Sequence, residues 1–428
     1  MRQMRLIGLV LLIALGLAAL PVLQPAAPAA QAQGSATFTI EETTFESHYP
    51  RGMVFTIKAS SSGGDIARAV LFYRLRSGTR SRENADFDAA TGAWVADPYT
   101  EGGGLPPWVD FDYWWMLTDS AGNIFETEPQ HGVYADNTRE WYSVDTEDIT
   151  LYWYGFDESF GQMVADTMAR MRPIFEEGWG RLISYKPLAI IFPEGNAWDE
   201  YVSGGNNPDA AGFTSPETGY TLQRLSGLRT PEELMERLTR CGRRPEVITS
   251  HDPETWRLQD LAATIVHETT HLYQSDFNRS GPAWWQEAQP EYFARQSGYI
   301  TRDAFGRIAA YAQQYDLPTM QGDGPPLGVS TVSADGCNGL GYNMGEVFLT
   351  WMLDNYGGLE THRRILEAMP GHSMGEAIEI ATGVPFLDLE NQWRASLGLA
   401  PVGPPPTATP FQLPNLPNLP TPRPASSG

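Results

Sequence analysis

The chain has 428 residues, and its 52 acidic and 29 basic residues give a formal net charge of −23. A surface this acidic repels phosphate backbones, so nucleic acid is not an expected partner. The length suggests two or three domains.

The first 32 residues have the pattern of a secretory signal peptide. A basic start precedes an apolar run from residue 6 to about residue 23, and small residues then lead to an Ala30-x-Ala32 site. We therefore expect cleavage after Ala32 and a secreted protein, extracellular or associated with the cell surface, with no membrane segment in the mature form. The apolar run is near the lower limit for a bilayer span, so an uncleaved anchor is the alternative.

Residues 33–145 have a strand-like pattern. Runs rich in β-branched and aromatic residues begin near residues 36, 54, 68 and 108, and Gly, Ser, Asn and Pro separate them. The segment from Asp119 to Asn123 is typical of a hairpin turn. This spacing predicts an N-terminal antiparallel β-sandwich similar to immunoglobulin-like modules. Its Trp-rich strands indicate either core packing or an aromatic platform for carbohydrate.

From residue 146 to about residue 400 strands and helices are mixed, with a helical C-terminal half. The expected elements are strands at 149–154, 186–193 and 218–222, and helices at 160–177, 260–274 and 341–356, followed by three short helices. The expected fold is therefore multidomain, with a β-sandwich followed by an α+β domain. Residues 401–428 are Pro-rich and are expected to form a disordered tail, with a linker or wall-spanning role as the alternative.

The segment His267-Glu268-Thr269-Thr270-His271 has the form H-E-x-x-H inside a helical run. Residues four apart share a helix face, so both imidazoles can reach one metal ion, with Glu268 beside them. Zinc accepts neutral histidine nitrogens, and a catalytic zinc keeps one position for water. A carboxylate next to that water can take its proton. The motif therefore predicts a Zn²⁺ site with Glu268 as general base; a surface helix with solvent-facing histidines is the alternative.

The segment that follows resembles the gluzincins, zinc peptidases of the thermolysin and aminopeptidase type (peptidase MA-like). Their third ligand is a glutamate on the next helix, often in a W-x-x-E-G-x-A-x-Y-like context. The residues that match this pattern are Trp284, Glu287, Tyr292 and Ala294, and those that depart from it are Ala288 and Pro290. The resemblance extends weakly from about residue 149 to residue 399. It implies a zincin-like metallopeptidase domain over 146–400, with His267, His271 and Glu287 as zinc ligands.

Two further residues near the motif are candidates for supporting roles. Glu291 lies four residues after Glu287 and could accept a hydrogen bond from a ligand imidazole, or be an ordinary exposed carboxylate. The resemblance makes Tyr342 a candidate donor to the oxyanion of the tetrahedral intermediate, with a packing tyrosine as the alternative. By the same resemblance, the last strand before the metal helix, about 218–222, would form the sheet edge that pairs with a bound peptide.

The two cysteines, Cys241 and Cys337, are predicted to form a disulfide, because an isolated pair in an exported chain most simply pairs. Both lie in loop-like contexts, so a bridge would tie the loop before the metal helix to the loop after the third ligand. Zinc ligation by either cysteine is the rival interpretation.

The expected function is that of a secreted zinc metallopeptidase that acts on a peptide or protein substrate. A non-catalytic or weakly catalytic peptide- or glycan-binding protein on the same fold is the alternative. The intact Glu268 argues against that alternative, whereas Ala288 and Pro290 argue slightly for it. A zinc hydrolase of non-peptide amides is a third hypothesis, which the sequence does not separate from the first.

Overall fold

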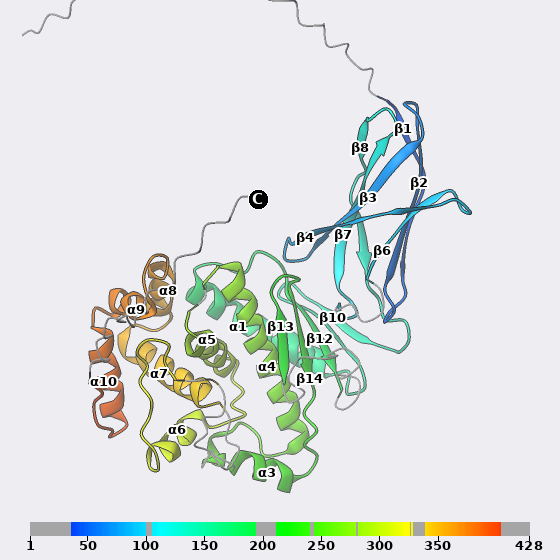
Figure 1. The fold of residues 1–428 in the computed structure, drawn as a ribbon. Coiled ribbons are helices and arrows are strands. Elements are labelled where there is room, and N and C mark those ends of the chain that lie inside the picture. Colours follow the sequence, from blue (N-terminus) through cyan, green and yellow to red (C-terminus); the bar gives the residue numbers. More distant parts are fainter. Residues whose placement is uncertain are drawn as a thin grey trace, which may run out of the picture.

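The computed structural model describes residues 36–99, 105–193, 211–239, 244–279, 281–325, 327 and 339–403 (Figure 1). An N-terminal region of mostly antiparallel β-sheet leads into a mixed sheet and then into a helical C-terminal half. This arrangement confirms the expected order of β structure followed by helices. The signal segment 1–32, both cysteines, Cys241 and Cys337, and residues 404–428 of the tail lie outside the described residues.

The N-terminal region contains two antiparallel sheets with a common core. Their strand orders are β1-β2-β6-β5 and β4-β3-β7-β8, with β9 also paired to β7. The strands are β1 (Phe38–Ser47), β2 (Met53–Ser61), β3 (Ile66–Leu75), β4 (Arg80–Asn84), β5 (Asp86–Asp88), β6 (Ala93–Tyr99), β7 (Asp110–Asp119), β8 (Ile124–Glu126) and β9 (Gln130–Val133). The backbone N–H of Asp119 bonds the carbonyl of Asn123, which confirms the predicted hairpin turn. Trp115 on β7 is 1% exposed, so this tryptophan serves core packing.

The mixed sheet has the order β10-β11-β12-β14-β13. Its strands are β10 (Tyr142–Asp145), β11 (Thr150–Trp153), β12 (Leu188–Phe192), β13 (Gly212–Ser215) and β14 (Tyr220–Arg224). The three inner strands are parallel to one another, and the two edge strands are antiparallel. The boundary expected at residue 145 therefore falls inside the β10–β11 hairpin, and β10 belongs with this sheet.

The prediction that residues 218–222 form the sheet edge is wrong. A turn whose Thr218 and Gly219 N–H groups bond the carbonyl of Ser215 folds the chain into a β13–β14 hairpin. The returning strand β14 pairs with β12, which leaves β13 at the edge. We expected one strand after a turn, whereas the chain forms two strands joined by a turn.

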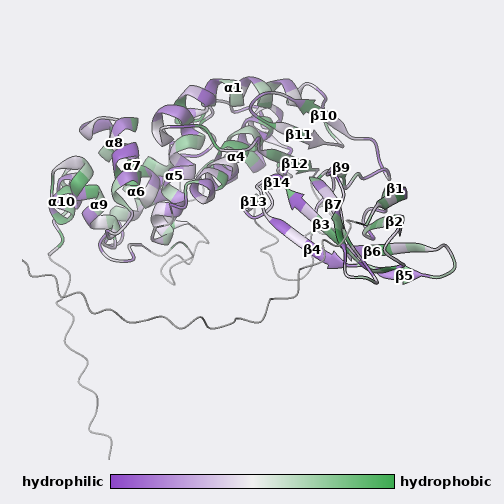
Figure 2. Ribbon diagram, turned by 90° about the horizontal axis from the view of Figure 1, so that it is seen from above, coloured by the Kyte–Doolittle hydropathy of each residue, from purple (hydrophilic) through white to green (hydrophobic). Residues whose placement is uncertain are grey.

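Both faces of the mixed sheet are buried, and β12 shows this most clearly because all five of its residues are buried. One face, with Ala189 and Ile191, joins the core of the helices, whereas the other, with Leu188 and Ile190, joins the core of the N-terminal sheets. Successive side chains of a strand point to opposite faces, so one strand can serve two cores. Seen from above, the sheet lies between the helices and the N-terminal strands (Figure 2).

The helices cover one face of the mixed sheet and continue beyond it (Figure 1). They are α1 (Phe160–Trp179), α3 (Pro231–Thr239), α4 (Pro253–Asp276), α5 (Ala283–Gln296), α6 (Ala304–Ala312), α7 (Leu340–Tyr356), α8 (Leu359–Ala368), α9 (Met374–Thr382) and α10 (Phe386–Ser396), with a 3-10 turn at Pro245–Val247. The side chain of Asp252 caps the N-terminus of α4, and Pro253 occupies its first position. Within the described residues, no helix combines the length and apolar composition that a bilayer span requires.

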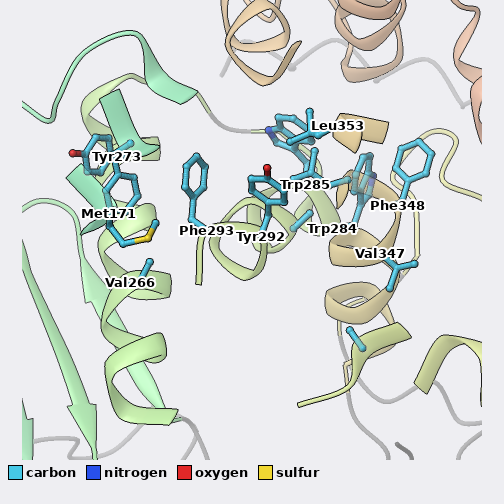
Figure 3. Close-up of a cluster of buried hydrophobic side chains, with 14 of the residues drawn as sticks. Met171, Val266, Tyr273, Trp284, Trp285, Tyr292, Phe293, Val347, Phe348 and Leu353 are labelled. Atoms are coloured by element: carbon cyan, nitrogen blue, oxygen red, sulfur yellow. The ribbon is translucent and has the colours of Figure 1, made fainter. Parts of the chain in front are cut away.

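Helix α5 packs against both α4 and α7. Its Trp284, Trp285, Tyr292 and Phe293 form an aromatic layer between these helices (Figure 3). Gly345 of α7 permits the close approach, since a Cβ there would lie 2.9 Å from the Cβ of Ala288. Ala288, which departs from the gluzincin pattern, is thus accommodated by a glycine on the facing helix.

Candidate metal centre

His267 and His271 of α4 converge with Glu287 of α5. The Nε2 atoms of the two histidines lie 3.5 and 3.6 Å from Oε2 of Glu287. Among the described residues, these three make up the one group of histidine, cysteine and acidic side chains with metal-binding geometry, and their ligand atoms lie within 4.8 Å of one another. Two nitrogens and one oxygen are a ligand set that zinc takes, with a fourth position for water.

The Oε2 atom of Glu287 shows that this set fits a cation. It is buried and has no hydrogen-bond partner among the described residues, and a buried carboxylate oxygen normally has one. Burial lowers the pKa of His267, but the carboxylates of Glu291, Glu287 and Glu268 outweigh it and raise that pKa well above its ordinary value. The surroundings of His267 therefore favour positive charge, which either a proton or a metal ion supplies.

Glu268 lies beside the ligand set and is not one of the three converging groups. It is 7% exposed, and the hydroxyl of Thr214 lies 2.5 Å from its Oε2. The other oxygen lies against Gly212, where a Cβ would be only 2.4 Å from Oε1. The edge strand β13 therefore holds the Glu268 carboxylate in place. The hydroxyl of Thr214 bonds one oxygen, and Gly212, which has no side chain, leaves room for the other.

Glu291 lies behind His267, on the side away from Glu287. Its Oε1 is 3.5 Å from Nδ1 of His267, and its Oε2 pairs with Arg302. Arg302 also contacts Glu346, with Nη2 2.9 Å from Oε2. Burial raises the pKa of Glu291, but Arg302 and His267 outweigh it, so the pKa lies below its usual value. Glu291 thus lies next to a ligand imidazole and is not an ordinary exposed carboxylate, and its pairing with Arg302 was not predicted from the sequence.

His271 is supported by a chain of hydrogen bonds that the sequence did not reveal. Its Nδ1 lies 2.8 Å from Oε1 of Gln274, and Nε2 of Gln274 donates to Oε1 of Gln289 at 2.8 Å. Nε2 of Gln289 lies 2.7 Å from Nε2 of His362, whose Nδ1 lies 2.8 Å from the carbonyl of Gly178 at the end of α1. The three inner members, Gln274, Gln289 and His362, are 8%, 0% and 0% exposed.

A carbonyl oxygen only accepts, so the direction of every bond in this chain is fixed from Gly178 outward. His362 donates through Nδ1 and accepts through Nε2, and each glutamine then donates through its nitrogen. Oε1 of Gln274 must accept, so His271 carries its proton on Nδ1 and presents the Nε2 lone pair to the ligand set. A hydrogen bond at the second ring nitrogen fixes the tautomer of a metal-binding histidine in this way.

Pro290 contributes to the same chain. It lies in the interior of α5. Proline has no N–H, so the carbonyl of Gln286, four residues earlier, lacks its helical partner. Nε2 of Gln274 donates to that carbonyl at 2.8 Å. The missing helical bond is thus replaced by a bond that holds Gln274 under His271.

Tyr342 lies in the first turn of α7 and lines the same cleft as the histidines. Burial and the nearby carboxylates of Glu287 and Glu291 raise the pKa of its phenol, so its hydroxyl keeps its proton. The cleft has a volume of about 510 Å³. Its lining residues are Gly212, Thr214, Pro216, His267, Glu268, His271, Gln274, Ser275, Asn278, Arg279, Gln286, Glu287 and Tyr342.

No family model and no curated protein matches this chain. Among solved structures, a carbohydrate-binding module family 56 β-1,3-glucan binding domain is similar at 14% identity over 22% of this chain and 98% of that one, with a TM-score of 0.16. A polysaccharide deacetylase from Bacillus cereus shares 11% identity over 56% and 87% of the two chains, with a TM-score of 0.19. An aminopeptidase N family protein from Idiomarina loihiensis shares 10% identity over 81% and 54%, with a TM-score of 0.21. Scores this low establish no common fold, so the function must be inferred from the site.

Proposed function

We propose that this protein is a secreted, zinc-dependent peptidase with a zincin-like catalytic domain of the gluzincin type. The observation that carries the proposal is the convergence of His267, His271 and the partnerless buried oxygen of Glu287, with Glu268 beside this set but outside it. Zn²⁺ held by these three residues would activate a water molecule and polarise a carbonyl group.

The protein's own groups supply the proton transfers and the positioning. Glu268 takes the proton of the attacking water and later delivers it to the leaving amine. Thr214 and Gly212 keep its carboxylate in one orientation, so it need not reorganise during the reaction. The protonated hydroxyl of Tyr342 donates to the oxygen on which negative charge develops.

The substrate is proposed to lie along β13. This strand is the antiparallel edge of the mixed sheet, and its Gly212 and Thr214 line the cleft beside Glu268. An extended peptide can add to such an edge through main-chain hydrogen bonds, which demand little of its side chains. This geometry favours a peptide chain over a compact small molecule as the substrate.

The experiment that tests the proposal compares wild type with Glu268→Gln and Glu287→Ala on a peptide library, with zinc content measured for each. Glu268→Gln should keep its zinc and lose hydrolysis by about 10²- to 10⁴-fold, because only the proton acceptor is removed. Glu287→Ala should lose both zinc and activity. Full turnover by Glu268→Gln, or no hydrolysis by zinc-loaded wild type, would sink the proposal.

A further inference from the structure

The β3–β4 hairpin concentrates arginine in a chain that is otherwise acidic. From the start of β3 to the end of β4, residues 66–84 contain five arginines and one acidic residue, Glu83, whereas the whole chain has a net charge of −23. One of the five, Arg76, bonds Asp110 and the carbonyl of Lys186 at the contact between the N-terminal sheets and the mixed sheet. The other four are Arg68, Arg74, Arg80 and Arg82, and we call them the arginine face.

The strand register places these four on one surface. Residues 69, 71, 73 and 75 of β3 point into the core, so Arg68, Phe72 and Arg74 point outward. Across the β3–β4 ladder, Arg80 lies opposite Arg74, and Arg82 lies opposite Phe72. Cross-strand partners share a face, which puts both β4 arginines on the outer surface.

This face carries a net positive charge. Its acidic neighbours by register are Asp112, paired with Arg74 at 2.6 Å, and Glu126, so four arginines and two acids leave a net charge of 4 − 2 = +2. Phe72 stacks on Trp114 with ring centroids 5.7 Å apart, and the guanidinium of Arg80 lies 5.9 Å from the Trp114 ring. All residues of the edge strand β4 are exposed. Arg80 and Arg82 form no ion pair with any described residue.

The pairing of Arg74 with Arg80 is unfavourable for folding alone. Like charges directly opposite each other destabilise a β-ladder, and only Arg74 has an acidic partner. An edge strand can be protected from aggregation by charge, but in so acidic a chain carboxylates would serve equally well. The arrangement is therefore better suited to binding an anionic partner.

The arginine face continues into the proposed peptide-binding edge. The hydroxyl of Ser77, at the tip of the β3–β4 hairpin, donates to the carbonyl of Glu217 in the β13–β14 turn. Pro216, the neighbour of Glu217, lines the cleft. In Figure 1 the end of the β3–β4 hairpin lies next to the β13–β14 hairpin, as this contact requires. The end of the cleft at Pro216 therefore lies close to the hairpin that carries Arg80 and Arg82.

We propose that the arginine face is an exosite that binds an acidic segment of the polypeptide substrate, at a distance along the substrate from the bond held in the cleft. This inference rests on the proposed peptidase function, because it requires one chain to occupy both β13 and β4. An acidic segment adds charge complementarity to main-chain binding and so contributes mainly to substrate selection.

The test uses the full-length protein carrying Glu268→Gln, so that binding is measured without turnover. The probes are fluorescein-labelled 20-residue peptides with five Glu at either end, and analogues with Gln in place of Glu. Only one of the two acidic peptides is expected to place its Glu segment on the arginine face when its other end lies in the cleft. At low salt this peptide should bind about 3- to 10-fold more tightly than its Gln analogue, as expected for two exposed ion pairs. This difference should disappear in Arg80→Gln/Arg82→Gln and at 0.5 M salt.

The matched control is Arg51→Gln/Arg364→Gln, which removes two exposed arginines from other surfaces. In the Glu268→Gln background, whose net charge is −23 + 1 = −22, both double variants have a net charge of −22 − 2 = −24. The control should keep the preference for the acidic peptide. If both double variants lose it equally, the effect is one of bulk charge and the exosite is refuted.

Two further outcomes also decide the matter. If Arg80→Gln/Arg82→Gln abolishes adsorption to anionic polysaccharide or to phosphatidylglycerol vesicles but leaves peptide binding unchanged, the proposed partner is wrong. If wild type hydrolyses the peptides, Arg80→Gln/Arg82→Gln can be introduced into the protein with Glu268 intact. The substitutions should then raise KM for the acidic peptide about 3- to 10-fold and leave kcat unchanged. Failure of the peptidase proposal would show as absent hydrolysis in wild type, which the binding measurement does not depend on.

Discussion

Replacement of Gln274 by methionine tests the hydrogen-bond chain behind His271. The side chains are similar in volume, so the change chiefly removes the amide. Three bonds are lost: from His271 Nδ1 at 2.8 Å, and to Gln286 O and Gln289 Oε1 at 2.8 Å each. His271 is then free to rotate and to change tautomer.

The expected effect on zinc is large. Loss of such a supporting partner typically weakens metal affinity by about 10- to 100-fold, which corresponds to about 1.4 to 2.7 kcal/mol. The three orphaned groups also cost stability in the metal-free protein, about 1–3 kcal/mol for each group that water cannot reach. The two effects are separated by measuring the zinc Kd by chelator competition and the unfolding of the metal-free protein in urea.

Glu390→Met is the matched control. Glu390 is 0% exposed and accepts three hydrogen bonds, from Thr319, the N–H of Met320 and Gln321, on α10 rather than at the metal centre. It should destabilise the metal-free protein and leave the zinc Kd unchanged. An unchanged zinc Kd in Gln274→Met, or an equal loss of zinc affinity in the control, would refute the role assigned to the chain.

Three other substitutions give distinct expected outcomes. Pro290→Ala should stabilise α5, because an interior proline costs about 3 kcal/mol. It should also weaken zinc binding by up to about 10-fold, because the restored N–H competes with Gln274 for the Gln286 carbonyl. Urea unfolding should therefore show a higher stability of the metal-free protein, and chelator competition a higher zinc Kd. Gly212→Ala should displace Glu268, because the new Cβ at position 212 would lie 2.4 Å from Oε1 of Glu268. We expect kcat/KM to fall by about 10²-fold with the zinc content unchanged. A fully active variant would contradict this expectation. Burial lowers the pKa of His362 to about 4, so protonation of this side chain favours the unfolded state. The free energy of unfolding of the metal-free protein should therefore fall by up to about 3 kcal/mol as the pH drops from about 6.5 to 4. His362→Gln should reduce this pH dependence, measured by urea unfolding at pH 7 and 4.5.

The elements that the sequence predicted well are those with a strong local signal. The helical spacing around His267 and His271 belongs to α4, and the helix expected at 341–356 is α7. The alternating strands of the N-terminal region form antiparallel sheets. In each case the pattern lies within one segment, so no knowledge of distant partners was needed.

The features that the sequence did not predict depend on contacts between distant segments. The edge position of β13 is decided by which strand of the hairpin pairs with β12, and Gly212 matters only because Glu268 lies against it. Gln274 carries no motif; its role arises because Pro290 leaves one carbonyl free. An i, i+3 spacing of Gln274 from His271 is the one signal that could have suggested the contact.

Metal analysis of the purified protein determines whether His267, His271 and Glu287 hold one zinc ion. We expect about one zinc per chain in wild type, largely lost in Glu287→Ala and retained in Glu268→Gln. A wild-type protein that binds no zinc after reconstitution, or a Glu287→Ala variant that binds zinc as tightly as wild type, would show that these residues are not a zinc site.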